Sequence, residues 1–199
     1  MKKKTYAFRH KNEVLLESSS GGAFTALANV IISRGGIVFG ACFDKELNVV
    51  HKKAETIEEC FKFRGSKYIQ SSMTGVYIQI KECLENGRIV LFTGTPCQIK
   101  AVKNYCNKNS INIDNLVLVD IICHGAMRPD VWQKFRQWIE GKHHSRIVHI
   151  NFRYKKTRWH SYPIHIEFEN GKVLTNTFDA RRFNELFFSS IALLNGCYK

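Results

Sequence analysis

The stretch IVLFTGTPCQ, residues 89–98, decides the fold, and LVLVDIICHG, residues 116–125, completes the unit that it opens. Each begins as a short apolar run with β-branched residues, which is typical of a buried strand. Between them, Thr95 is a good N-cap and Pro96 suits the first position of a helix. A strand, a helix and a strand at this spacing predict a parallel βαβ unit, which is right-handed almost without exception.

Two cysteines directly follow these two strands. Cys97 lies in the first turn of the predicted helix, where the dipole favours a thiolate, and Cys123 ends the second strand. Both thiols are therefore expected at the same carboxyl edge, where open α/β sheets bind ligands. Free cysteines are also common as small buried hydrophobes. We give that interpretation to the four that lie inside other predicted elements, Cys42, Cys60, Cys83 and Cys106.

The composition is that of a globular protein with a sizeable core. Of the 199 residues, 44% are hydrophobic and 24% are charged, and no apolar stretch reaches the length of a membrane span. No apolar run follows the basic start, so we expect no secretory signal, a cytoplasmic protein and no membrane insertion. Seven cysteines without the spacing of a disulfide framework favour a reducing compartment and metal or redox use. We expect residues 1–199 to form a single domain.

The net charge of +13 attracts polyanions, so nucleic acid has to be considered as a partner. However, the lysines and arginines are spread along the chain, and no predicted helix presents a solid basic face. We therefore expect most of them to be solvated, with anionic cofactors or an acidic protein partner as the next interpretation, and no specific nucleic acid.

Patterns on either side of the central unit predict a mixed α/β (α+β) fold. Residues 24–31 repeat apolar side chains at helical spacing, and residues 37–43 and 49–54 are predicted to pair as strands. The strongest hairpin signal joins residues 164–168 to residues 173–178 through an Asn-Gly turn. The prediction is a mixed sheet with a central parallel βαβ unit and an antiparallel hairpin near the C-terminus.

Three weaker patterns complete the predicted fold. Short strands are predicted over residues 4–9 and 13–16, and a last helix over about residues 180–194. In a strand over residues 147–152, strict alternation places Val148 on the same face as Ile150 and Phe152.

Two turns have the composition of anion sites. Ser19-Ser20-Gly21-Gly22 precedes a helix, where unpaired N–H groups and the helix dipole face a ligand. Arg64-Gly65-Ser66-Lys67-Tyr68 places two cations around a flexible turn beside an aromatic ring, which suits a pyrophosphate or a flavin edge. Ordinary serine capping and a solvated loop are the alternatives, and the residues alone leave them open.

The chain ends on Gly196-Cys197-Tyr198-Lys199, where a Cys-x-x-Cys ligand pair would begin. We therefore expect a fragment of a longer chain, truncated at its C-terminus. His124 lies between Cys123 and a glycine turn and has two interpretations. It donates a hydrogen bond to a sulfur or a proton to a substrate near neutral pH, or it caps the turn.

Several motifs follow one another along nearly the whole chain. In order they are Ser19-Ser20-Gly21-Gly22, Gly36 to Phe43 with Asp44, Arg64 to Tyr68 with Gln70-Ser71, Gly94-Thr95-Pro96-Cys97-Gln98, Cys123-His124-Gly125 with Trp132, Asn151-Phe152-Arg153 and Cys197-Tyr198. This order resembles the coenzyme F420 hydrogenase/dehydrogenase beta subunit family, in its C-terminal domain.

The resemblance implies an electron-transfer oxidoreductase subunit that binds FAD and a 4Fe-4S cluster and, in methanogens, reduces coenzyme F420. By resemblance, the two turns and Thr95 would bind FAD, with Lys67 close to its anionic parts, and Lys67 and His124 would be the catalytic residues. The implied cluster ligands are Cys97, Cys123 and Cys197. The implied partners are a ferredoxin or another iron-sulfur chain and a small-molecule redox substrate.

Two other classes of function fit parts of the sequence. A zinc-stabilised binding module would use the same three cysteines with His124 as ligands. A weak polyanion or nucleic-acid binder would use the net charge, with Trp159 and Tyr162 for stacking.

Overall fold

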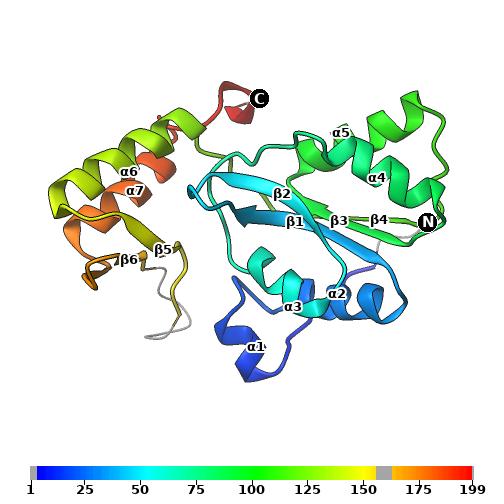
Figure 1. Cartoon of the computed structure of the whole chain (residues 1–199), viewed down its shortest axis with the longest axis horizontal. Coiled ribbons are helices and arrows are strands. Elements are labelled where there is room, and N and C mark those ends of the chain that lie inside the picture. Colours follow the sequence, from blue (N-terminus) through cyan, green and yellow to red (C-terminus); the bar gives the residue numbers. More distant parts are fainter. Residues whose placement is uncertain (1–3, 156–162, 199) are drawn as a thin grey trace.

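The computed structural model describes residues 4–155 and 163–198. Two lobes lie side by side in Figure 1, each built on its own sheet. The first lobe, residues 23–120, holds a four-stranded sheet with helices α2 to α5, and the second lobe, residues 129–188, holds a three-stranded sheet with helices α6 and α7. The connecting segment, residues 121–128, joins them. None of the helices in the described residues is long and apolar enough to cross a membrane.

The four-stranded sheet has the order β2-β1-β3-β4. Strands β1 (Ile37–Phe43), β3 (Val90–Gly94) and β4 (Leu116–Asp120) run parallel, and β2 (Val49–Ala54) pairs with β1 in the antiparallel sense. Helix α5 (Pro96–Lys108) crosses from β3 to β4. The predicted central βαβ unit and the mixed sheet are therefore confirmed.

Helices cover both faces of this sheet (Figure 1). Helices α4 (Val76–Glu85) and α5 bury one apolar cluster against it. On the other face, α2 (Ala23–Ser33), α3 (Ile57–Cys60) and the short 3-10 helix η1 (Phe61–Phe63) bury a second cluster. Strands covered on both faces need apolar side chains at successive positions, which explains the continuous runs in β1 and β3. The four cysteines assigned to packing, Cys42, Cys60, Cys83 and Cys106, are all buried.

The second lobe is an antiparallel sheet in the order β5-β6-β7 with two helices packed on it. Its elements are α6 (Pro129–His143), β5 (Ile147–Asn151), β6 (His165–Phe168), β7 (Val173–Thr175) and α7 (Phe178–Phe188). The predicted hairpin is β6 with β7, so it is confirmed. The 3-10 helix η2 (Asn195–Tyr198) follows the lobe.

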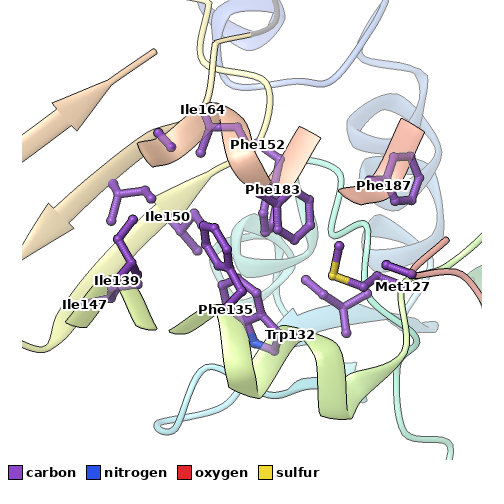
Figure 2. Packing of buried hydrophobic residues seen from close by; sticks show 14 of the residues in the cluster. Met127, Trp132, Phe135, Ile139, Ile147, Ile150, Phe152, Ile164, Phe183 and Phe187 are labelled. Atoms are coloured by element: carbon purple, nitrogen blue, oxygen red, sulfur yellow. The ribbon is translucent and has the colours of Figure 1, made fainter. Parts of the chain in front are cut away.

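Aromatic rings fill the core of the second lobe (Figure 2). Trp132 from α6 lies edge-on to Phe183 from α7 at 5.8 Å and to Phe152 at 5.9 Å between ring centroids. Its indole N–H donates to the carbonyl oxygen of Leu47 at 2.7 Å, and Leu47 belongs to the loop between β1 and β2. Trp132 therefore ties the second lobe to the first.

Four local predictions are wrong. Residues 13–16, predicted as a strand, lie in helix α1 (Asn12–Leu16), which buries only Leu15, and residues 4–9 form no regular element. A bulge between Ile147 and His149 shifts the register of β5, so Val148 is 56% exposed while Ile150 is buried. Helix α7 ends at Phe188 rather than near residue 194, because the chain there turns back towards the connecting segment.

Candidate functional site

A cavity of about 610 Å³ lies where the start of α5, the connecting segment and η2 meet. All three cysteines that the resemblance assigns to a cluster, Cys97, Cys123 and Cys197, line it. They come from three segments far apart in the sequence, so the tertiary structure brings them together. The structure also places Thr95, which the resemblance assigns to FAD binding, in this cavity.

Backbone hydrogen bonds on both sides of the connecting segment hold it in place beside the cavity. Met127 accepts from Gln70 N–H at 3.0 Å and donates to Tyr68 at 2.8 Å, on one side of the segment. On its other side, Arg128 N–H donates to Ala192 at 2.9 Å. The segment that leads to Cys197 is therefore held alongside the segment that carries Cys123.

Gly125 permits the close approach of these two segments. Its φ is +154°, and a Cβ at this position would lie 2.6 Å from Leu193 Cδ1 and 3.4 Å from Cys197 Cβ. A side chain here would have to displace the end of the Leu193 side chain. The glycine in the Cys-His-Gly motif thus has a packing role that its motif alone does not reveal.

The pKa of the Cys123 thiol is raised by its surroundings in the cavity. Burial raises the pKa of Cys123, the backbone N–H of Gly125 lowers it, and negative charge on Cys197 or Cys97 raises it again. Within the described residues, no group of three or more His, Cys, Asp or Glu side chains is arranged to hold a metal ion. Ligands of a single zinc stand about 4 Å apart, because each lies about 2.3 Å from the ion. The thiolates of a 4Fe-4S cluster bind different iron atoms and stand further apart.

The two predicted anion turns lie together. Ser66 Oγ donates to Ser19 Oγ at 2.8 Å, and Arg64 Nε donates at 3.2 Å to Thr25 Oγ1 in the first turn of α2. Gly22, with a φ of +81°, is the N-cap of that helix. The turns therefore place a guanidinium, two hydroxyl groups and a helix N-terminus in one region.

The remaining residues of the second turn are used differently. Lys67 Nζ donates to the carbonyl oxygens of Lys62 at 2.9 Å and Arg64 at 2.7 Å, and burial lowers its pKa to about 8. Tyr68 packs its ring against Phe187 of the second lobe, 4.6 Å between centroids. Here Lys67 holds the shape of the turn, and Tyr68 packs between the lobes.

His124 has an exposed side chain whose ring lies 5.4 Å from that of Phe187 and 6.0 Å from that of Phe188. It is not among the described residues that line the cavity. Trp159 and Tyr162, which the polyanion hypothesis would use, lie outside the described residues.

Sequence reasoning gave no site role to three buried polar residues behind the cavity, His51, Ser71 and Gln98, although the last two lie in motifs of the resemblance. One signal was available for His51, because alternation in β2 places it on the inward face with Val49. Thr95 and Gln98 have the spacing of a capping box, which is a local signal, but the other partner of Gln98, Ser71, lies 27 positions away along the chain.

The fold and the cavity together define an α/β protein with thiols gathered at the carboxyl edge of its main sheet. A family model that describes the C terminus of the beta subunit of coenzyme F420 hydrogenase/dehydrogenase matches residues 87–197, more than half of the chain. The chain belongs to this family.

Two relatives extend the comparison. The F420-dependent formate dehydrogenase 1 subunit beta of Methanococcus maripaludis is 28% identical over 134 residues, which is 65% of this chain and 34% of that protein. A chain in a xenon-derivatised structure of the F420-reducing NiFe hydrogenase complex from Methanosarcina barkeri superposes with a TM-score of 0.57 at 22% identity, covering 96% of this chain and 62% of that chain. The second likeness concerns the fold. The chain spans about a third of the curated relative's length.

Proposed function

We propose that the chain is an electron-transfer oxidoreductase subunit that binds a 4Fe-4S cluster through Cys97, Cys123 and Cys197 and FAD at the two turns. The observation that carries the proposal is the convergence of these three thiols on one cavity from three separate segments. Family membership and the names of both relatives, which are F420-linked redox enzymes, support the same class of chemistry.

Three thiols line the cavity, and thiolates are the ligands that hold iron-sulfur clusters. Cys97 and Cys123 are exposed and Cys197 is half-buried, so all three are accessible to an inserted cluster. Ile121 and Ile122, which follow β4 and precede Cys123, are exposed apolar side chains, and we propose that they contact a partner chain.

The two turns fit the anionic part of FAD. Arg64 supplies a permanent positive charge, and the N-terminus of α2 supplies unpaired N–H groups. Ser19 and Ser66, bonded to each other, orient hydroxyl groups in the same region. When bound, FAD would exchange two electrons with a substrate and the cluster would pass them on singly. The proposal includes Lys67 and His124 as the catalytic residues. The ammonium group of Lys67 also holds the second turn, through its hydrogen bond to Arg64.

The proposal also includes the location of the chain and its partners. We place the chain in the cytoplasm, with a small-molecule redox substrate and a ferredoxin or another iron-sulfur chain as partner. The net charge of +13 favours an acidic partner surface. Residues 1–199 would act as one flavin and iron-sulfur unit of a longer protein.

Anaerobic reconstitution with iron, sulfide and FAD tests the proposal. We expect a flavin spectrum with a broad iron-sulfur shoulder, and we expect the shoulder and the bound iron to fall in Cys97→Ser, Cys123→Ser and Cys197→Ser. Cys83→Ala is the matched control, because this thiol is buried away from the cavity and should leave the iron content unchanged. Arg64→Gln should weaken FAD binding and leave the iron in place. A colourless protein that holds stoichiometric zinc would contradict the proposal.

A further inference from the structure

A row of hydrogen bonds begins inside the first lobe, behind the cysteine cavity. His51 of β2 has its Nε2 3.0 Å from the carbonyl oxygen of Thr93 and its Nδ1 2.8 Å from Ser71 Oγ. Ser71 Oγ accepts a hydrogen bond from Gln98 Nε2 at 2.7 Å. These groups come from β2, β3, the chain before α4 and the first turn of α5, so the row depends on the tertiary fold.

The row continues outwards to the cavity. Gln98 Oε1 accepts from Thr95 N–H at 3.0 Å and lies 3.1 Å from Thr95 Oγ1. Thr95 Oγ1 in turn lies 3.0 Å from Cys97 Sγ. A continuous chain of polar contacts therefore connects the buried imidazole to the thiol.

The inner residues of the row are polar and yet buried. Six polar or charged residues are buried in the described part of the chain, and three of them, His51, Ser71 and Gln98, belong to this row. Buried polar groups lower stability unless their hydrogen bonds are satisfied, and a fully satisfied network fixes one arrangement. The row therefore defines the orientation of each of its members.

The direction of each hydrogen bond follows from the inner end. The carbonyl of Thr93 can only accept, so His51 Nε2 carries a hydrogen. Burial lowers the pKa of His51, so the ring is neutral and its Nδ1 accepts the Ser71 hydroxyl hydrogen. Since Ser71 has no second hydrogen, it accepts from the amide group of Gln98. The carbonyl of Gln98 then has to face Thr95.

The Thr95 hydroxyl is consequently left with a choice of two acceptors. While Cys97 carries its proton, the S–H group donates to Thr95 Oγ1 and the hydroxyl donates to Gln98 Oε1. Once Cys97 is a metal-bound thiolate, the hydroxyl hydrogen can turn to the sulfur. Gln98 Oε1 stays satisfied in both states, because the backbone N–H of Thr95 still donates to it.

We infer that Thr95 donates a hydrogen bond to the metal-bound thiolate of Cys97, and that Gln98, Ser71 and His51 are positioning residues that keep this donor available. The inference rests on the proposed function, since it requires a metal at Cys97. A hydrogen bond to a ligating sulfur withdraws negative charge from it and makes the iron easier to reduce. The carboxamide of Gln98 does not relay protons as a hydroxyl does, so the row positions groups rather than conducting protons.

The reduction potential of the reconstituted cluster tests the inference. Thr95→Val removes the donor and keeps the shape, and Thr95→Ser restores the donor. We expect Thr95→Val to disfavour reduction of the cluster by about tenfold, roughly one net hydrogen bond, which is about 59 mV for one electron. Thr95→Ser should return the potential to that of the wild type. Ser71→Ala should shift the cluster potential in the same direction by less.

Binding of Co²⁺ alone separates this inference from the proposed function. Its sulfur-to-cobalt absorption band should move to lower energy in Thr95→Val, even if no cluster can be formed. Wild-type protein that holds neither a cluster nor Co²⁺ through Cys97 would overturn both. An unchanged potential and an unchanged band in Thr95→Val would overturn the role of Thr95 and leave the proposed function standing. A Ser71→Ala protein identical to the wild type would overturn the positioning roles.

Discussion

Replacing Gly125 by alanine should loosen the wall that η2 and the connecting segment form together. The new Cβ would lie 2.6 Å from Leu193 Cδ1, so the leucine has to move. The φ of +154° strains any residue with a Cβ, at a cost of about 1–3 kcal/mol. Displacing the end of a flexible side chain adds about 1 kcal/mol, the low end of the range for overpacking. A total of about 3 kcal/mol should lower the melting temperature by roughly 6–12 °C.

Gly141→Ala is the matched control for this substitution. Gly141 lies in α6, and a Cβ there would meet no atom within 4 Å. Alanine should stabilise that helix by about 0.5–1 kcal/mol. The assay is thermal unfolding of both variants, with iron content after reconstitution as a second measurement. A Gly125→Ala protein that melts with the wild type and holds as much iron would refute the assignment of this glycine to the cavity wall.

Three further predictions concern the second lobe. Trp132→Phe should lower the free energy of unfolding in urea by about 2–4 kcal/mol, because it creates a cavity and leaves a loop carbonyl without its donor. The Lys142 ammonium donates to the Asp179 carboxylate and lowers the pKa of this carboxyl below 3.8. The ionised carboxylate therefore stabilises the fold above pH 3.8, and this stabilisation is lost as the pH falls through the lowered pKa. The urea midpoint of Asp179→Asn should consequently depend less on pH between 5 and 2 than that of the wild type. Ile150→Ala should lower the free energy of unfolding by about 2–5 kcal/mol, whereas Val148→Thr should change it by no more than about 0.5 kcal/mol. Equal losses of stability in urea unfolding would show that β5 has no bulge.

The central unit was predictable because its local signals agree. Apolar runs, the Thr95 and Pro96 start of α5 and the length between strands all indicate the same crossover, and the structure contains it. The bulge in β5 was not predictable from the sequence, because strict alternation cannot show where an extra residue enters a strand. The strand predicted over residues 13–16 failed for a related reason, since a short apolar run does not distinguish a strand from one turn of helix.

Some residues of the candidate site were predictable from the sequence and others were not. Sheet geometry alone placed Cys97 and Cys123 at one edge, because both follow parallel strands. The sequence marked Cys197 as the start of a possible Cys-x-x-Cys pair, but only the family resemblance joined it to Cys97 and Cys123, since no local rule tells where a chain end folds back. The row behind Cys97 pairs Ser71 with Gln98 across 27 positions of sequence and with His51 across 20. Such partners become visible only when the fold is known.

The position of the cavity couples cofactor binding to the packing of the two lobes. Cys97 belongs to the first lobe, Cys123 to the connecting segment and Cys197 to the segment that follows α7. A cluster held by all three would stabilise only the arrangement that brings these segments together, since a ligand that binds one state stabilises that state by its binding free energy. Reconstitution should therefore raise the melting temperature of the wild type more than that of Cys197→Ser, which lacks the thiol from the segment after α7. An equal increase in both proteins would mean that the cluster does not use Cys197.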